Sequence, residues 1–202
     1  MEYYMLHKPR GCITASRDAR HQTVFDYLPK DFAERVFAVG RLDKDTEGLL
    51  LLTDDGPLAA RLLDPLHGTE KCYEFYCIGS PSEQGIATLQ MGTVLDREGL
   101  VYARPARFSS LGTTTLGAIA PLLSYEDAKL CRKHPDTSVL HATLIVTEGK
   151  KHQVKRMMRS VGCRIVYLKR RSIGPLTLDP RLAPGEYRAL TDDELRLLKE
   201  PI

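Results

Sequence analysis

The chain has 202 residues, of which 43% are hydrophobic and 27% are charged, and its formal net charge is +3. These values are ordinary for a globular protein and exclude a disordered or collagen-like chain. No apolar run approaches the ~20 residues of a membrane helix, so we expect no membrane partner. The five cysteines form no CxxC pair, which argues against a disulfide framework and favours a reduced, cytoplasmic compartment.

Apolar runs, capping residues and turn signals predict the elements of the N-terminal part of the chain. They are a strand at 3–6, a turn at 8–11, a short helix at 23–29, strands at 36–39 and 48–53, and a helix at 57–63. Between the last two strands lies a polar insert that contains Arg41, Asp43, Asp45 and Glu47. Because both ends of this insert return to the core, we expect a rigid loop of the kind that carries reactive groups. A solvated hairpin connection is the alternative interpretation.

The same signals predict a less regular succession of elements after residue 70. They are a strand at 70–78, a helix that opens at 80–83 and reaches 91, two short strands within 92–107, a helix at 123–134, a strand at 139–146, a helix at 151–161, a strand at 164–168, and a final helix opened by the capping box at 191–194. Strands and helices do not alternate regularly, which predicts an α+β fold with a mixed, mostly antiparallel central sheet flanked by helices. We expect one domain over 1–202, with two lobes that meet near 65–70.

Positive charge is concentrated in one segment. Residues 148–171 contain nine lysines or arginines against a single glutamate, while the rest of the chain is mildly acidic. In the helix predicted at 151–161, Lys151, Lys155 and Arg159 recur every four residues. A basic block on an acidic body is typical of a protein that binds a polyanion, and it favours nucleic acid as partner. The alternative is an ordinary solvated helix face.

Several kinds of site have no support in the sequence. The six histidines show neither HxxxH spacing nor pairing with cysteine, so no metal site is expected. No glycine-rich phosphate loop and no nucleophile elbow is present. A carboxylate in a tight loop, a tyrosine on a strand and a basic helix remain as candidates for chemistry.

These remaining features carry a resemblance to pseudouridine synthases of the RsuA/RluB/RluE family. The matching segments occur in family order, and they are HKPRG at 7–11, GRLDKDTEGLLLLTDDG at 40–56, KCY at 71–73, EGKKHQVKRMMRSVG at 148–162, LKRRSIGPLTL at 168–178 and PGEYRALTDDEL at 184–195. The resemblance implies the family's catalytic fold, with two lobes around an active-site cleft. It also implies that a uridine in RNA is isomerised to pseudouridine without a cofactor.

The resemblance assigns catalytic roles to three residues. Asp43 matches the catalytic aspartate, which must be ionised and close to the bond between sugar and base. Lys155 matches its basic partner, often an arginine in the family. Tyr73 matches the active-site tyrosine, whose ring can stack on a uracil that has left the RNA stack. Taken alone, Tyr73 is more simply an ordinary half-buried strand tyrosine.

The resemblance and the basic block together nominate residues for holding the RNA. They are Lys8, Arg41, Lys71, Lys151, His152, Gln153, Arg156, Arg159, Leu168 and Arg170. Arg41 matches an arginine that fills the space left by the flipped base, and its alternative is a phosphate contact or a salt bridge. Leu168 matches an apolar residue behind the base, and its alternative is plain core.

Three readings of the function stay open. A synthase acting on ribosomal RNA, or on a ribosomal assembly intermediate, is favoured by the QVKRM motif at 153–157. A non-catalytic RNA-binding or ribosome-assembly protein and a synthase acting on transfer RNA are the alternatives. We expect a monomer whose sequence starts directly at the catalytic domain, without the small RNA-binding module that begins many relatives. Residues 108–138 match no family motif.

Overall fold

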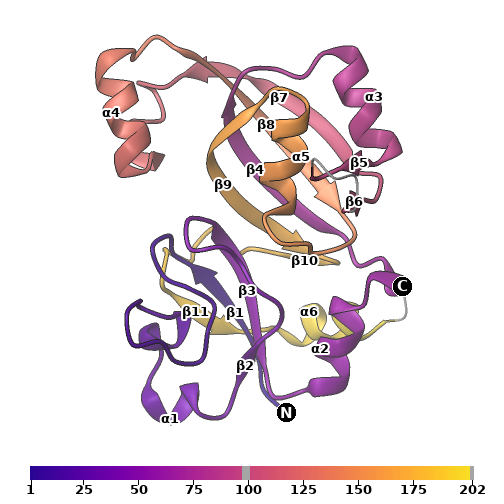
Figure 1. Ribbon diagram of the computed structural model, residues 1–202. Coiled ribbons are helices and arrows are strands. Elements are labelled where there is room, and N and C mark those ends of the chain that lie inside the picture. The colour runs from indigo at the N-terminus through magenta and orange to yellow at the C-terminus, as the bar shows by residue number, and fades with distance from the viewer. Residues whose placement is uncertain (97–100, 201–202) are drawn as a thin grey trace. The chain divides into compact units, whose positions relative to one another are not determined.

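The computed structural model describes residues 1–96 and 101–200. It divides the chain into two compact units (Figure 1). The first unit comprises Met1–Lys71 and Lys169–Ile202, and the second comprises Cys72–Leu168. The chain therefore enters the second unit next to the expected boundary near 65–70. Its return to the first unit at Lys169 was not anticipated from the sequence.

The first unit holds strands from both ends of the chain. Its elements are β1 (Tyr3–Lys8), η1 (Val24–Tyr27), α1 (Lys30–Ala33), β2 (Phe37–Ala38), β3 (Glu47–Thr53), α2 (Gly56–Leu63), η2 (Pro65–His67), β10 (Leu176–Thr177), β11 (Tyr187–Ala189) and α6 (Asp192–Lys199). The strand order is β11-β1-β3-β9, with β2 on β3 and β10 on β9. The pairs of β1 with β3 and with β11 are antiparallel, and β3 pairs with β9 in parallel.

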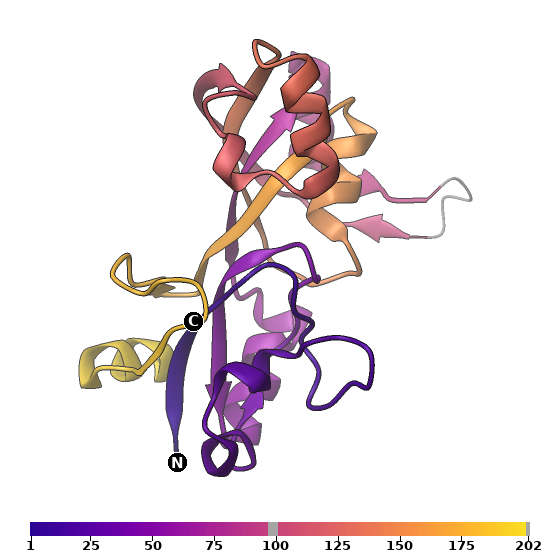
Figure 2. The same ribbon diagram turned by 90° about the vertical axis from the view of Figure 1, so that its left-hand side faces the viewer.

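Both faces of this sheet are covered, which explains why every residue of β3 is buried. Leu49 and Leu51 face a core that includes α2 and α6. Leu50 and Leu52 face a second core that includes η1 and α1. Both views show α1 on one side of β1 and α6 on the other (Figure 1, Figure 2).

The second unit is built around the strand order β9-β4-β8-β7. Its elements are β4 (Lys71–Ile78, whose first residue ends the first unit), α3 (Glu83–Met91), β5 (Thr93–Val94), β6 (Tyr102–Ala103), β7 (Arg107–Thr115), η3 (Ala120–Leu122), α4 (Tyr125–Lys133), β8 (Ser138–Val146), α5 (Gln153–Ser160) and β9 (Arg164–Ile173, which continues into the first unit). Helices α3 and α5 cover one face of the sheet, where Phe75, Cys77 and Leu144 form the main core. The 116–131 segment packs on the other face, against Val139 and Val166.

The predicted α+β fold is confirmed, and most predicted elements lie where the sequence indicated. The main omission is β7, within the segment that matched no motif. β7 is an exposed edge strand rich in serine and threonine, so it lacks the apolar alternation that marks half-buried strands. Strands β10 and β11 were also missed. Within 1–96 and 101–200, no helix combines the length and apolar character that crossing a membrane requires.

Candidate active site

Asp43 lies in the loop between β2 and β3, in the first unit. Its carbonyl oxygen accepts a hydrogen bond from the Thr46 N–H at 3.0 Å, which closes a tight turn. Asp43 itself is half-buried, whereas Lys44 and Asp45, the two central residues of the turn, are exposed. Asp43 is therefore partly shielded from water, whereas the nearby acid Asp45 is not.

The segment that follows β1 clamps this loop. The Thr14 hydroxyl donates to the Leu42 carbonyl at 3.0 Å and accepts from the Leu42 N–H at 3.1 Å. The Gly11 N–H donates to the Lys44 carbonyl at 2.7 Å. Both clamps act on backbone next to Asp43, so the position of its carboxylate is set from outside the loop as well as within it.

The buried side chain of Lys8 also holds the loop. Its side chain is fully buried, and its ammonium donates to the carbonyls of Thr46 at 2.8 Å and Pro9 at 2.9 Å. Burial lowers the pKa of Lys8, while the nearby Cys12 thiol and the Asp45, Asp43 and Glu47 carboxylates oppose this effect. Lys8 was expected to contact RNA, but in this structure its ammonium is buried and bonded to backbone carbonyls. The lysine instead supplies positive charge beneath a cluster of acids.

Glu47 anchors the far end of the loop. Its carboxylate lies 3.5 Å from His7 Nε2, 3.6 Å from Arg10 Nε and 3.4 Å from Lys169 Nζ. His7 is fixed in turn by a 2.7 Å contact between Nδ1 and the Leu182 carbonyl oxygen. One buried carboxylate thus connects β1, β3 and β9 at the point where the Asp43 loop enters β3.

The pairing of β3 with β9 requires a glycine. Gly48 has φ +113 and pairs with Arg170, and a Cβ at Gly48 would collide with the Arg170 backbone. Arg170 is buried, and its Nε donates to the Leu49 carbonyl at 2.8 Å. Lys71 is buried as well, and its ammonium donates to the Thr69 carbonyl at 3.0 Å. The expected RNA contacts of Lys71 and Arg170 are thus replaced by backbone contacts inside the protein.

Tyr73 and Lys155 both belong to the second unit. Tyr73 lies on β4 and packs half-buried against the main core of that unit. Val154, Met157 and Met158 attach α5 to the same core. Lys155 is half-buried on α5. The second unit therefore presents the tyrosine and the lysine from two elements that share one core.

A buried network shapes the start of α5. Glu148 is buried, and its carboxylate accepts from Gln153 Nε2 at 2.9 Å, from the Arg104 N–H at 2.8 Å and from the Lys150 ammonium. Gln153 Oε1 accepts in turn from the Lys150 N–H at 2.9 Å. His152, just before the helix, has φ +52. Gln153 was expected to contact RNA, but it is buried and holds the turn that sets where α5 begins.

The other predicted RNA-binding residues differ in exposure. Lys151, His152 and Arg159 are exposed on or beside α5, and Arg41 is exposed on the Asp43 loop. Arg156 is half-buried and donates from Nε and Nη2 to the Leu95 carbonyl, at 3.1 and 2.9 Å.

Leu168 is buried in the main core of the second unit. Among residues 1–96 and 101–200, no three His, Cys, Asp or Glu side chains are grouped as metal ligands would be.

Sequence reasoning missed the residues that hold these side chains in place. The contacts described above are made by the side chains of Thr14, Glu47 and Glu148. No role was assigned to any of these three residues from the motifs. Lys8 was expected to contact RNA, whereas in the structure its buried ammonium donates to the Thr46 carbonyl. The strand parity of β1 was a usable signal, because Lys8 falls on the same face as the buried Leu6.

Comparison with known proteins identifies the family of this chain. The profile of a family described as RNA pseudouridylate synthase matches residues 2–160. The uncharacterized RNA pseudouridine synthase YtzG of Bacillus subtilis is 43% identical over 200 residues, which cover 98% of this chain and 74% of that protein. Ribosomal small subunit pseudouridine synthase A of Salmonella typhimurium is 37% identical over 193 residues, which cover 96% and 72% of the two chains.

Solved structures give the same result. A crystal structure of a pseudouridylate synthase superposes with a TM-score of 0.78 at 33% identity, and it covers 98% of this chain and 73% of that one. The human protein RNA pseudouridylate synthase domain containing 4 shares the fold, with a TM-score of 0.52 at 15% identity. It covers 91% of this chain and 87% of its own.

Proposed function

This chain belongs to the RNA pseudouridine synthase family and is an isomerase, and we propose that it converts a specific uridine of ribosomal RNA to pseudouridine with Asp43 as the catalytic carboxylate. The main observation is the Asp43 loop, in which a half-buried aspartate lies on a backbone that is held by Lys8, Gly11 and Thr14. A loop clamped in this way favours catalysis over binding alone, because catalytic groups need a fixed geometry.

The reaction explains why a fixed carboxylate is needed. The bond between uracil N1 and the ribose carbon breaks, the base turns, and uracil C5 joins the same carbon. C5 then loses its proton and N1 gains one, so no atoms are lost overall. Asp43 either attacks a carbon of the nucleotide or stabilises the positive charge that develops on the sugar. The target base must first leave the RNA stack, since the sugar–base bond is inaccessible within it.

Tyr73 and Lys155 are proposed to complete the site. The ring of Tyr73 would stack on the flipped uracil, and its hydroxyl would assist removal of the C5 proton. The Lys155 ammonium would keep the Asp43 carboxylate ionised. The buried Glu148–Gln153 network fixes the start of the helix that carries Lys155.

The exposed cations would hold the RNA by its phosphates. Lys151 and Arg159 on α5 and Arg41 on the loop are exposed, and phosphate contacts supply most of the affinity of such complexes. We propose that the protein acts as a monomer on ribosomal RNA or on an assembly intermediate of the ribosome. The relative named ribosomal small subunit pseudouridine synthase A supports the ribosomal substrate and points to the small subunit.

Mapping of pseudouridine in ribosomal RNA tests the proposed substrate. RNA from cells that carry the gene is compared with RNA from cells that lack it, and from cells complemented with the wild type or with Asp43→Asn. We expect one pseudouridine to disappear without the gene and to return only with the wild-type protein. Unchanged ribosomal RNA together with a lost modification in transfer RNA would transfer the proposal to that substrate.

A further inference from the structure

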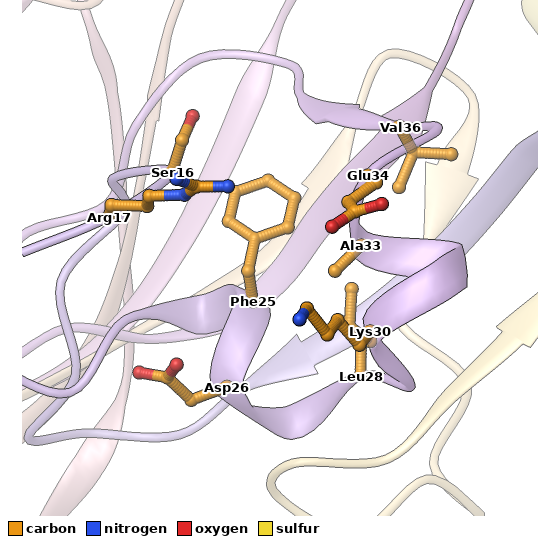
Figure 3. A pocket seen from close by; sticks show the side chains of 9 residues that line it. All are labelled: Ser16, Arg17, Phe25, Asp26, Leu28, Lys30, Ala33, Glu34 and Val36. Atoms are coloured by element: carbon orange, nitrogen blue, oxygen red, sulfur yellow. The ribbon is translucent and has the colours of Figure 1, made fainter.

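The first unit contains an open pocket of about 740 Å³ that the proposed chemistry does not use (Figure 3). Its floor is apolar and consists of Phe25, Leu28, Ala33 and Val36, from η1, α1 and the residues that flank them. Three of these four side chains are buried and Ala33 is half-buried. The floor is thus a firm apolar surface into which a flat apolar ring could settle.

Charged side chains surround this floor. Arg17, Lys30 and Glu34 line the pocket and are exposed. Figure 3 shows the side chains of Arg17, Lys30 and Glu34 among those that line the pocket. The pocket therefore combines an apolar floor with two cations and two carboxylates, those of Glu34 and Asp26, of which Asp26 already accepts from the Thr23 N–H at 2.7 Å.

The loop that carries Arg17 is ordered. The Ile13 N–H donates to the Gln22 carbonyl and the Val24 N–H to the Ile13 carbonyl, both at 2.9 Å, which closes the neck of the loop. At its tip, Asp18 accepts from the N–H groups of Arg20 and His21, each at 2.8 Å. These bonds lower the pKa of Asp18 and keep its carboxylate ionised. The hydrogen bonds at the neck and the tip of the loop preorganise this wall of the pocket for a ligand.

We propose that this pocket binds one unpaired guanosine nucleotide of the RNA substrate. An aromatic and aliphatic floor suits a nucleobase, because unstacked bases pack on such surfaces in single-stranded RNA. A carboxylate accepts hydrogen bonds, and guanine is the base with two adjacent donors, N1–H and the N2 amino group, on its Watson–Crick edge. Glu34 can satisfy both at once, while Arg17 and Lys30 contact the phosphates on either side.

The pocket is connected to the catalytic loop within the same unit. Thr14, which clamps Leu42, lies three residues before Arg17 in the segment that forms the pocket wall. A guanosine held there would reinforce the segment that supports Asp43. This inference rests on the proposed function, since it assigns the pocket to the same RNA, and it adds a base preference at a nucleotide other than the target uridine.

Binding of free nucleotides tests the pocket independently of catalysis. We would record ¹H–¹⁵N spectra of the full chain during titration with GMP, AMP, CMP and UMP. If nucleotides bind in the pocket, the amide signals of Phe25, Ala33 and Glu34 shift during the titration. We expect GMP to bind about tenfold more tightly than the other three nucleotides, as expected for one bidentate contact. Equal shifts with all four nucleotides, or no shifts at these amides, would overturn the proposal.

Two matched variants sharpen the result. Glu34→Gln keeps the size of the side chain but replaces one acceptor by a donor, so the preference for GMP should disappear while weak binding remains. Asp31→Asn changes an exposed acid on α1, three residues before Glu34, that pairs with Arg35 at 3.5 Å and does not line the pocket, and it should leave the preference intact. Loss of the preference in both variants would mean that net charge, not the pocket, selects the nucleotide.

Turnover separates this inference from the proposed function. With an RNA substrate that contains the guanosine, Glu34→Gln should raise KM about tenfold and leave kcat close to the wild-type value. If the wild type is active and Glu34→Gln has the same KM, the proposed guanosine site is wrong and the synthase assignment stands. A wild type that binds GMP in the pocket but forms no pseudouridine in any ribosomal RNA would contradict the proposed ribosomal substrate instead.

Discussion

Thr14 and Leu42 are joined by two hydrogen bonds that run in opposite directions. The hydroxyl of Thr14 donates to the carbonyl of Leu42 at 3.0 Å and accepts from its N–H at 3.1 Å. A single buried side chain thereby satisfies both backbone groups of the residue before Asp43. The Asp43 loop is therefore held by the segment after β1 and does not depend on its own turn alone.

Replacing this hydroxyl by a methyl group should loosen the loop. In Thr14→Val the Leu42 N–H and carbonyl lose their partner, so we expect unfolding free energy to fall by about 1–3 kcal/mol. We also expect kcat to fall more than KM rises, because the carboxylate would be less well placed. Chemical denaturation and steady-state kinetics measure the two effects. Thr88→Val is the matched control, since the Thr88 hydroxyl donates to the Gln84 carbonyl at 2.9 Å within its own helix, and it should be nearly neutral.

Lys8 gives a pH-dependent prediction. Burial lowers its pKa below 10.5, so between the folded and the unfolded pKa the unfolded chain binds more protons than the folded one. Stability from this group therefore rises as pH rises toward 10.5. We expect Lys8→Met to be less stable than wild type at pH 7, by about 1–3 kcal/mol because two carbonyls lose a donor. The gap should widen at pH 9.5 in denaturant titrations, and a gap that narrows would contradict this account of Lys8.

Gly48 should tolerate no side chain. Its φ of +113 and the nearby Arg170 backbone leave Gly48→Ala no relaxed position, and we expect a loss of about 3 kcal/mol or more in unfolding free energy. Gly149→Ala is the control, because a Cβ at Gly149 meets open space, and it should change stability by less than about 1 kcal/mol. Comparable stability losses in both variants would show that close packing of β3 on β9 is not the cause.

The basic face of α5 should govern RNA affinity. Lys151→Glu with Arg159→Glu should weaken RNA binding and reduce its dependence on salt, since two phosphate contacts are lost. The control carries the same charge change on α6, as Arg196→Glu with Lys199→Glu, and should bind more nearly like wild type. Filter binding at several salt concentrations measures both. Equal losses in the two double variants would indicate that overall charge, not the face of α5, sets the affinity.

The sequence predicted those parts of the fold that depend on local pattern. The apolar run at Leu49–Leu52, closed by the turn signal at 54–56, indicates a buried strand and lies in β3, and the capping box of Thr191 and Glu194 opens α6 as expected. Strand β7 escaped because edge strands exposed to solvent need no apolar alternation. The sequence also did not predict that β9 runs through both units. The apolar run ends at Leu168, whereas the strand continues to Ile173.

The site was predicted to a lesser degree, for a different reason. Motif resemblance nominated Asp43, Tyr73 and Lys155, but it could not say whether a cation faces solvent or the interior. Lys8, Lys71 and Arg170 are buried and donate to backbone carbonyls. A lysine or arginine in a sequence carries the same charge in either place. Only tertiary packing decides whether that charge meets an RNA phosphate or a carbonyl of the protein.

The most direct test of the central claim compares two neighbouring aspartates in one assay. Asp43→Asn and Asp45→Asn remove the same charge two residues apart, and tritium release from ribosomal RNA that contains 5-tritiated uridine reports turnover. We predict that Asp43→Asn abolishes release while it still binds RNA, and that Asp45→Asn retains most of its activity. Wild-type release by Asp43→Asn would contradict the assignment of Asp43 as the catalytic carboxylate.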